Sequence, residues 1–208
     1  MRTCLALAVA LCLAACNQPS EPSGNVSTPA PVPTPTAGAK PVAAATVPKV
    51  FSIDPGAGDI ELMQCHMGEC YWSQKQSATV VDRIGDGVRI KIVGRGGNST
   101  HPGDADMPDK WSPDIKVEWH EQTSYILCSL TRPRMLSKLD DQYYLDTLQL
   151  YVTPGFQVAA ANEYMAACHG LAPGSWDEQT LKRLGYAEIG SGQSSYKTLD
   201  EGLKAMAR

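Results

Sequence analysis

The chain changes character abruptly at Cys16, and this junction limits which residues can fold together. Residues 5–15 form an uninterrupted apolar run of eleven residues, which is too short for a bilayer span of about 20 residues. Arg2 is the only charged residue ahead of Glu21. A positive start followed by an apolar run of this length predicts a secretory signal over residues 1–15.

The end of this run, Leu13-Ala14-Ala15-Cys16, resembles the lipobox of bacterial lipoproteins. The resemblance covers only the first sixteen residues. It implies cleavage before Cys16, a diacylglycerol on the Cys16 thiol and an acylated new N-terminus, for example with palmitate. Two or more acyl chains hold a protein firmly in a bilayer, at about 0.8 kcal/mol per buried CH₂. The alternative is an ordinary signal peptide with an A-x-A-like cleavage site.

The residue after the cysteine bears on the membrane in which the protein resides. In the lipoprotein family an aspartate at this position tends to retain the protein in the inner membrane, and here the residue is Asn17. The resemblance therefore favours a lipid anchor in the outer membrane of the cell envelope, with the rest of the chain facing the periplasm.

Residues 16–49 contain eight prolines, few charges and no aromatic residue. Such a segment cannot bury enough apolar surface to offset the entropy lost on ordering. We therefore expect a disordered linker with polyproline character between the lipidated Cys16 and a folded domain.

Residues 50–208 remain, a length typical of one globular domain with its own core. This part carries 15 basic and 21 acidic side chains, a net charge of −6. Because no basic patch stands out, nucleic acid is not an expected partner. No motif for a cofactor is found in the sequence, and none is expected.

The predicted domain contains four cysteines, Cys65, Cys70, Cys128 and Cys168. An even number in an exported protein favours disulfides over a metal site or a catalytic thiol. Three pairings are open, and we favour Cys65–Cys70 and Cys128–Cys168, because the first pair brackets a four-residue hairpin tip. Loop entropy alone makes these bonds worth about 2 and about 4 kcal/mol.

Alternating apolar and polar residues predict strands in the first two thirds of the domain. The expected hairpins pair residues 60–65 with 70–82, and residues 115–120 with 125–130 through a turn at 121–124. Further strands are expected at 88–93 and 143–152.

The last third has helical periodicity. Helices are expected over residues 157–169, from a capping box at 175–178 to Gly185, and from a second capping box at 198–201 to 207. Strands followed by helices predict an α+β fold, with a mostly antiparallel sheet, helices packed on one of its faces, and disulfide staples.

The most unusual segment is residues 94–113, which is too long for a simple turn. Long loops without secondary structure are often functional, so this one is the candidate binding loop. We expect no metal site, because the spacing of its aspartates is not that of an EF-hand and solvated turn residues explain them better. Its chemistry-bearing side chains are Arg95, His101, Asp104, Asp106, Asp109 and Trp111.

No standard motif for a nucleophilic or metal-dependent hydrolase is present. Glu118 and Glu121 flank His120, but strand alternation predicts Glu118 and His120 on the solvent side. The favoured reading is a membrane-anchored binding module that recognises another protein, such as an inhibitor or immunity protein against a periplasm-acting hydrolase. The alternatives are an envelope hydrolase that uses His101 or His120 with nearby carboxylates, and a lipoprotein with a structural role in envelope assembly.

Overall fold

A computed structural model describes residues 49–103 and 106–208. The predicted signal, the lipidated Cys16, nearly all of the linker, and Asp104 of the candidate loop lie outside the described residues. The described strands are β1 (Ile60–His66), β2 (Glu69–Ile84), β3 (Gly87–Thr100), β4 (Glu118–Cys128), β5 (Arg134–Leu139), β6 (Gln142–Thr147) and β7 (Gly192–Tyr196). The helices are the 3₁₀ turn η2 (Gly155–Gln157), α1 (Val158–His169), α2 (Glu178–Leu184) and α3 (Leu199–Met206).

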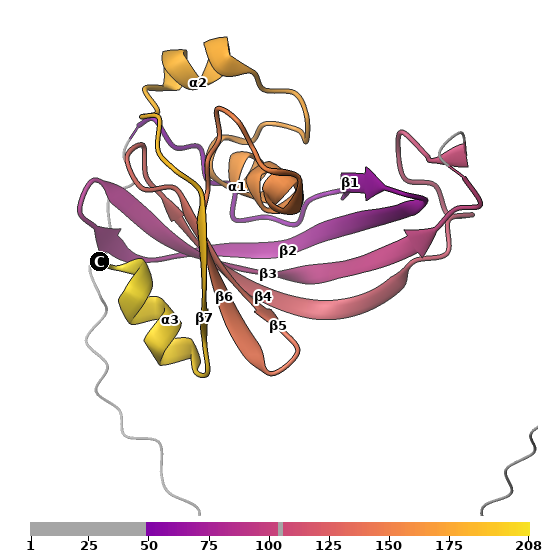
Figure 1. Cartoon of the computed structure of the whole chain (residues 1–208), viewed down its shortest axis with the longest axis horizontal. Coiled ribbons are helices and arrows are strands. Elements are labelled where there is room, and N and C mark those ends of the chain that lie inside the picture. Colours follow the sequence, from indigo (N-terminus) through magenta and orange to yellow (C-terminus); the bar gives the residue numbers. More distant parts are fainter. Residues whose placement is uncertain (1–48, 104–105) are drawn as a thin grey trace, which may run out of the picture. The chain divides into compact units, whose positions relative to one another are not determined.

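The seven strands form one antiparallel sheet in the order of the chain, from β1 to β7 (Figure 1). Short turns join β1 to β2, β2 to β3 and β5 to β6, since antiparallel neighbours need only a hairpin connection, whereas residues 101–117 join β3 to β4 and residues 148–191, with α1 and α2, join β6 to β7. Gly68 and Gly85 take positive φ values of 80° and 60° in the first two hairpin turns, a conformation that costs glycine little. The predicted hairpin of residues 60–65 and 70–82 is confirmed.

Two predicted irregular segments are strand instead. Residues 94–100, assigned to the candidate loop, continue β3, and residues 121–124, assigned to a turn, lie within β4. Residues 94–100 form strand because β2 and β4 pair on both sides of them. The Tyr71 hydroxyl also donates to Gln122 Oε1 at 2.8 Å across β3. A Cβ on Gly96 would lie 2.4 Å from that hydroxyl, so the glycine permits the crossing and does not break the strand.

Strands β5 and β7 were not predicted from the sequence. Arg134 begins β5, and β7 lies between α2 and α3 in the chain. The Arg134 guanidinium donates to the carbonyls of Ala205 and Met206, and Arg132 donates to Arg208 O. These two arginines therefore bind carbonyls at the C-terminal end of α3, where cations are favoured.

The helices pack on both faces of the sheet, so the expectation of one face is wrong. Helix α1 covers the face formed by Ile90, Ile126 and Met135 with their neighbours. Helix α3 covers the opposite face, against Leu127 and Leu136 (Figure 1). The physical reason is strand alternation: β4 and β5 carry apolar residues on both faces where they cross the centre of the sheet, and each face needs a cover.

The helix ends follow the sequence signals in most respects. Gly170 and Gly185 end α1 and α2 with left-handed φ values of 65° and 89°. Thr198 and Glu201 form the predicted capping box of α3. Helix α2 starts later than predicted, because Asp177 is its N-cap. Among the described residues, no helix has the length and apolar character that a bilayer crossing requires.

Both predicted disulfides are present. Cys65–Cys70 closes the β1–β2 hairpin, where the two residues lie opposite each other. Cys128–Cys168 joins the end of β4 to α1, and both cysteines are fully buried. The Cys128–Cys168 bond therefore holds α1 on the sheet.

Candidate functional site

The structure divides the candidate binding loop. Arg95 lies in β3, where its Nε donates to Gln74 Oε1 at 2.8 Å and its guanidinium lies 4.4 Å from the ring centre of Trp119. A stacked cation of this kind contributes about 0.5–1 kcal/mol at an exposed site. Arg95 is therefore part of the sheet surface and not of a loop.

His101 begins the loop that connects β3 to β4. Its backbone N–H donates to Gly68 O at 2.7 Å, and its Nε2 lies 2.8 Å from Ser99 Oγ. The same Ser99 hydroxyl accepts from the buried Trp72 indole at 2.7 Å. His101 thus attaches the loop to the β1–β2 turn.

The remaining described residues of the loop are dispersed. Asp106 and Asp109 are exposed, and Trp111 is half-buried beside Asp59 and Gln74. In residues 49–103 and 106–208 no three side chains of His, Cys, Asp or Glu gather at metal-binding distance. The structure therefore does not bring the described loop residues together as one site.

A cavity of about 180 Å³ lies between α1 and the first three strands. It is larger than an engineered apolar cavity of about 150 Å³ that binds benzene. Its wall is apolar on the side of the core and carboxylate-rich at the rim. The lining residues are Asp54, Gly58, Asp59, Glu61, Met63, Ser73, Lys75, Ile92, Glu163, Ala166, Ala167, Gly170 and Leu171. We call this space the Glu163 cavity.

Glu163 is the deepest ionisable group of the cavity. Its side chain comes from the middle of α1 and the residue is 7% exposed. Ser124 Oγ, on β4, donates to Glu163 Oε1 at 3.0 Å, and among the described residues we find no hydrogen bond to Oε2. Burial raises the pKa of Glu163 from 4.5 to about 7, although the bond from Ser124 acts in the opposite direction.

The rim carries more acid than base. Lys75 Nζ is bound to Asp54, with 2.7 Å to its carbonyl oxygen and 3.2 Å to its carboxylate. Within the described residues neither Asp59 nor Glu61 forms an ion pair. Burial and the charge of Asp59 raise the pKa of Glu61, while the charge of Lys75 acts in the opposite direction. The rim and Glu163 therefore place four carboxyl groups around one lysine.

A polar cluster in β2 and β4 lies on the sheet near the cavity. Tyr71 donates to Gln122, and Gln122 Nε2 lies 3.5 Å from Ser73 Oγ, which lines the cavity. Burial and the charge of Glu163 raise the pKa of Tyr71. Tyr71 therefore remains a neutral hydrogen-bond donor when Glu163 ionises.

The sequence reasoning missed Glu163. It lies in an alanine-rich helix. One signal was available, because Glu163 is the only acidic residue of α1 and stands in an otherwise largely apolar segment.

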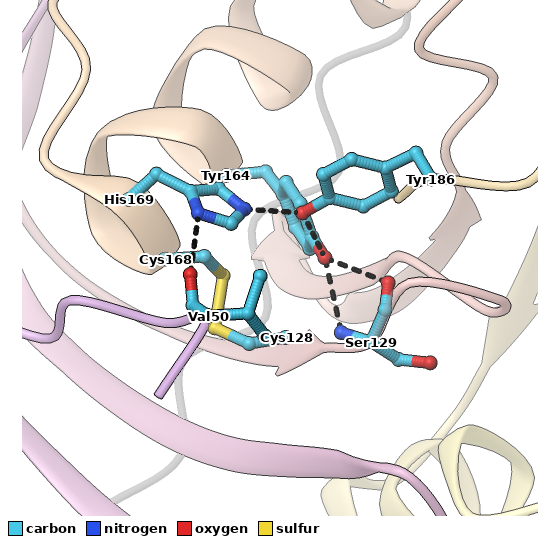
Figure 2. The surroundings of a disulfide bond; sticks show 7 residues. All are labelled: Val50, Cys128, Ser129, Tyr164, Cys168, His169 and Tyr186. Carbon is cyan, nitrogen blue, oxygen red and sulfur yellow. Dashed lines mark hydrogen bonds between the residues drawn. A yellow bond between two sulfur atoms is a disulfide. The ribbon is translucent and has the colours of Figure 1, made fainter. Parts of the chain in front are cut away.

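The C-terminal end of α1 contains a second polar cluster, beside the Cys128–Cys168 disulfide (Figure 2). The Tyr164 hydroxyl donates to Ser129 O and accepts from Ser129 N, each at 3.0 Å. The Tyr186 hydroxyl lies 3.0 Å from that of Tyr164 and 2.6 Å from His169 Nε2. His169 Nδ1 lies 3.1 Å from Val50 O, and since a carbonyl only accepts, Nδ1 carries a proton.

This network holds the start of the domain against α1. Ser52 N also donates to Cys168 O at 2.8 Å. Burial lowers the pKa of His169, while the bond to the Val50 carbonyl acts in the opposite direction. Each polar atom in the network lies within hydrogen-bond distance of a protein group, and the single Tyr186 proton serves either His169 Nε2 or the Tyr164 oxygen. The arrangement therefore stabilises structure and is not a ligand site.

The opposite face of the sheet has an open hollow of about 430 Å³ beside α3. Its lining includes Glu121, Tyr125, Tyr143 and Asp140, with Lys91 and Lys138. His120 also borders it, but His120 and Glu121 are neighbours in β4 and their side chains point to opposite faces of the sheet. Glu118, the other carboxylate flanking His120 in the sequence, does not line it.

Searches against models of protein families, curated protein sequences and solved structures give no match to this chain.

Proposed function

We propose that the chain is a lipid-anchored binding module of the bacterial cell envelope that recognises another protein. The anchor is Cys16, the linker is residues 16–49, and the domain faces the periplasm. In this proposal the domain acts as an inhibitor or immunity-type protein against a periplasm-acting hydrolase. The Glu163 cavity is its recognition element.

The observation that carries the proposal is a formed cavity between α1 and strands β1, β2 and β3. Helix α1 is tied to β4 by a buried disulfide, and β1 is tied to β2 by another. Asn162 Nδ2 also donates to Met63 O at 2.7 Å, which fixes α1 over β1. A preformed concave site loses little entropy on binding, because its side chains are already ordered.

The location of the cavity also suits a protein partner. Asp59 lines both the Glu163 cavity and the neighbouring hollow with Lys110 and Trp111. An aromatic and a charged residue beside a pocket are typical of the centre of a protein interface. The part of the candidate loop that contains Trp111 would then contact the same partner that enters the cavity.

The test is inhibition of purified hydrolases that act on the envelope, with the full-length chain in detergent micelles. We expect stoichiometric inhibition of one hydrolase class, and loss of that inhibition in Ala166→Trp, which fills the cavity. Ala207→Trp, at an exposed position after α3, is the matched control and should inhibit like the native chain. Absence of inhibition and of complex formation across the whole panel would contradict the proposal.

A further inference from the structure

We propose that the Glu163 cavity binds an alkylammonium or guanidinium group, such as the end of a lysine or arginine side chain that a partner inserts. This inference rests on the proposed function only for the protein nature of the partner. The binding of the cationic group itself is a property of the cavity.

The shape of the cavity fits an apolar stem with a polar head. Met63, Ile92 and Leu171 supply apolar wall, and Ala166 and Ala167 leave room where α1 turns past it. Glu163 and Ser73 supply the polar end. The volume of about 180 Å³ exceeds that of an engineered cavity of about 150 Å³ that holds benzene, so a four-carbon alkylammonium group fits.

The charges select the sign of the ligand. Four carboxyl groups, from Asp54, Asp59, Glu61 and Glu163, line the cavity, and Lys75 is the only cationic side chain among its lining residues. Lys75 is bound to Asp54 at the rim, so its charge is largely compensated there. An entering cation is attracted first by the rim carboxylates and then by Glu163, where the low dielectric strengthens the interaction.

Glu163 has the free capacity that such a ligand needs. Ser124 occupies Oε1, while Oε2 has no partner among the described residues. An ammonium group supplies three donors and no acceptor, so it can bind Oε2 and the Ser73 hydroxyl at once. An anion meets four carboxyl groups and one lysine that is already bound to Asp54, and a neutral alkyl chain leaves Glu163 Oε2 without a partner.

Binding is expected to depend on pH through the groups that face the cavity. Glu163 must ionise to pair with a cation, and its pKa is about 7. Asp54, Asp59, Glu61, Lys75 and Tyr71 are the other charged or titratable groups near the cavity. The pKa of Asp54 lies below its usual value because of hydrogen bonds from Gly56 and Lys75, and burial raises the pKa of Glu61 and of Tyr71. Affinity for a cation therefore rises between pH 5 and pH 8, and binding releases a proton from Glu163 near neutral pH.

The experiment uses n-butylammonium chloride as the probe, with the full-length chain in detergent micelles and NMR titration of the amides of α1 and β2. We expect a dissociation constant in the millimolar range, corresponding to about −4 kcal/mol, and affinity at pH 8 at least tenfold higher than at pH 5. 1-Butanol and sodium butyrate are the neutral and anionic controls of the same length, and they should bind at least tenfold more weakly.

Two substitutions separate electrostatics from folding, because they change the affinity in opposite directions. Glu163→Gln keeps the acceptor for Ser124 and should reduce butylammonium affinity about tenfold and abolish its pH dependence. Lys75→Gln removes the competing cation at the rim and should increase the affinity about threefold. The inference is wrong if 1-butanol binds as tightly as butylammonium, or if Glu163→Gln leaves the affinity unchanged.

The result also distinguishes this inference from the proposed function. If butylammonium binds as expected but no hydrolase is inhibited, the cationic site stands and the inhibitor role fails. If a hydrolase is inhibited and Glu163→Gln inhibits equally well, the binding module stands and the cationic site is wrong.

Discussion

Helix α1 buries polar groups at two places, and these places differ in how completely the polar groups are hydrogen-bonded. At its C-terminal end, Tyr164 and His169 belong to a network in which each polar atom has a partner from the protein (Figure 2). In its middle, Glu163 has one partner, Ser124, and faces a cavity. Glu163 and Tyr164 are adjacent in the sequence, but Tyr164 belongs to the hydrogen-bonded network and Glu163 faces the cavity.

The comparison separates a structural polar cluster from a candidate site. A buried hydroxyl with all its hydrogen bonds contributes to stability, and its removal leaves unpaired partners. A buried carboxyl with one hydrogen bond costs stability when it ionises, because the protein replaces less of its hydration. Groups that cost stability and face a cavity are where binding or catalysis is found.

The largest expected effect comes from the disulfide beside the network. Replacing Cys128 and Cys168 by alanine should lower the free energy of unfolding by about 4 kcal/mol, because the bond closes a 40-residue separation. The matched control, Cys65→Ala with Cys70→Ala, opens a separation of five residues and should cost about 2 kcal/mol. Denaturant titration measures both, and a reversed order would mean that the network end does not control stability.

Glu163→Gln should stabilise the protein, and the gain should depend on pH. The pKa of Glu163 is about 7 in the folded protein and 4.5 ordinarily, so the folded state binds the proton more tightly. Below pH 4.5 Glu163 costs nothing. Between pH 4.5 and 7 the ionisation of Glu163 increasingly lowers the free energy of unfolding, and above pH 7 this loss is about 3 kcal/mol.

Thermal unfolding at pH 4 and pH 8 measures this difference. The substituted chain should match the native chain at pH 4 and exceed it at pH 8. Equal stability at pH 8 would show that the Glu163 carboxylate is already compensated, and the contrast with the network would disappear.

Tyr164→Phe should cost about 2 kcal/mol, because the Ser129 N–H and carbonyl, both in a fully buried residue, lose their partner. The control is Tyr151→Phe. The Tyr151 hydroxyl donates to Tyr186 O at 2.9 Å from a less buried position, and its loss should cost under about 1 kcal/mol. Urea unfolding compares the two, and equal costs would weaken the assignment of the network as structural.

The smallest expected change in stability is that of Ser124→Ala, under about 1 kcal/mol. The informative quantity is the pKa of Glu163. The bond from Ser124 lowers that pKa, so its loss should raise it further. Carboxyl ¹³C NMR titration measures the shift, and a lower pKa in Ser124→Ala would show that another group compensates Glu163.

The sequence predicted elements and local constraints best where one residue type has one physical role. Gly170 and Gly185 mark helix ends because a left-handed residue is needed there. The four cysteines were paired correctly because the first pair brackets a hairpin tip. Alternation located the first hairpin, since one residue faces the core and the next faces away.

The same reasoning failed where pairing with strands distant in the sequence decides the local structure. The residues 94–100 have loop composition, yet they form strand because β2 and β4 pair on both sides of them. The residues 121–124 are polar and still continue β4 for the same reason. Strand pairing supplies hydrogen bonds that no local propensity records.

The sequence by itself indicated that most strands precede α1, where α1 and α2 end, and which of the three cysteine pairings to favour, because these follow from backbone conformation and short-range spacing. Only the tertiary structure decided that α1 and α3 cover opposite faces and that Glu163 lies buried over Ser124. The burial of a carboxyl group depends on which residues surround it in space, and those come from strands up to about a hundred positions away.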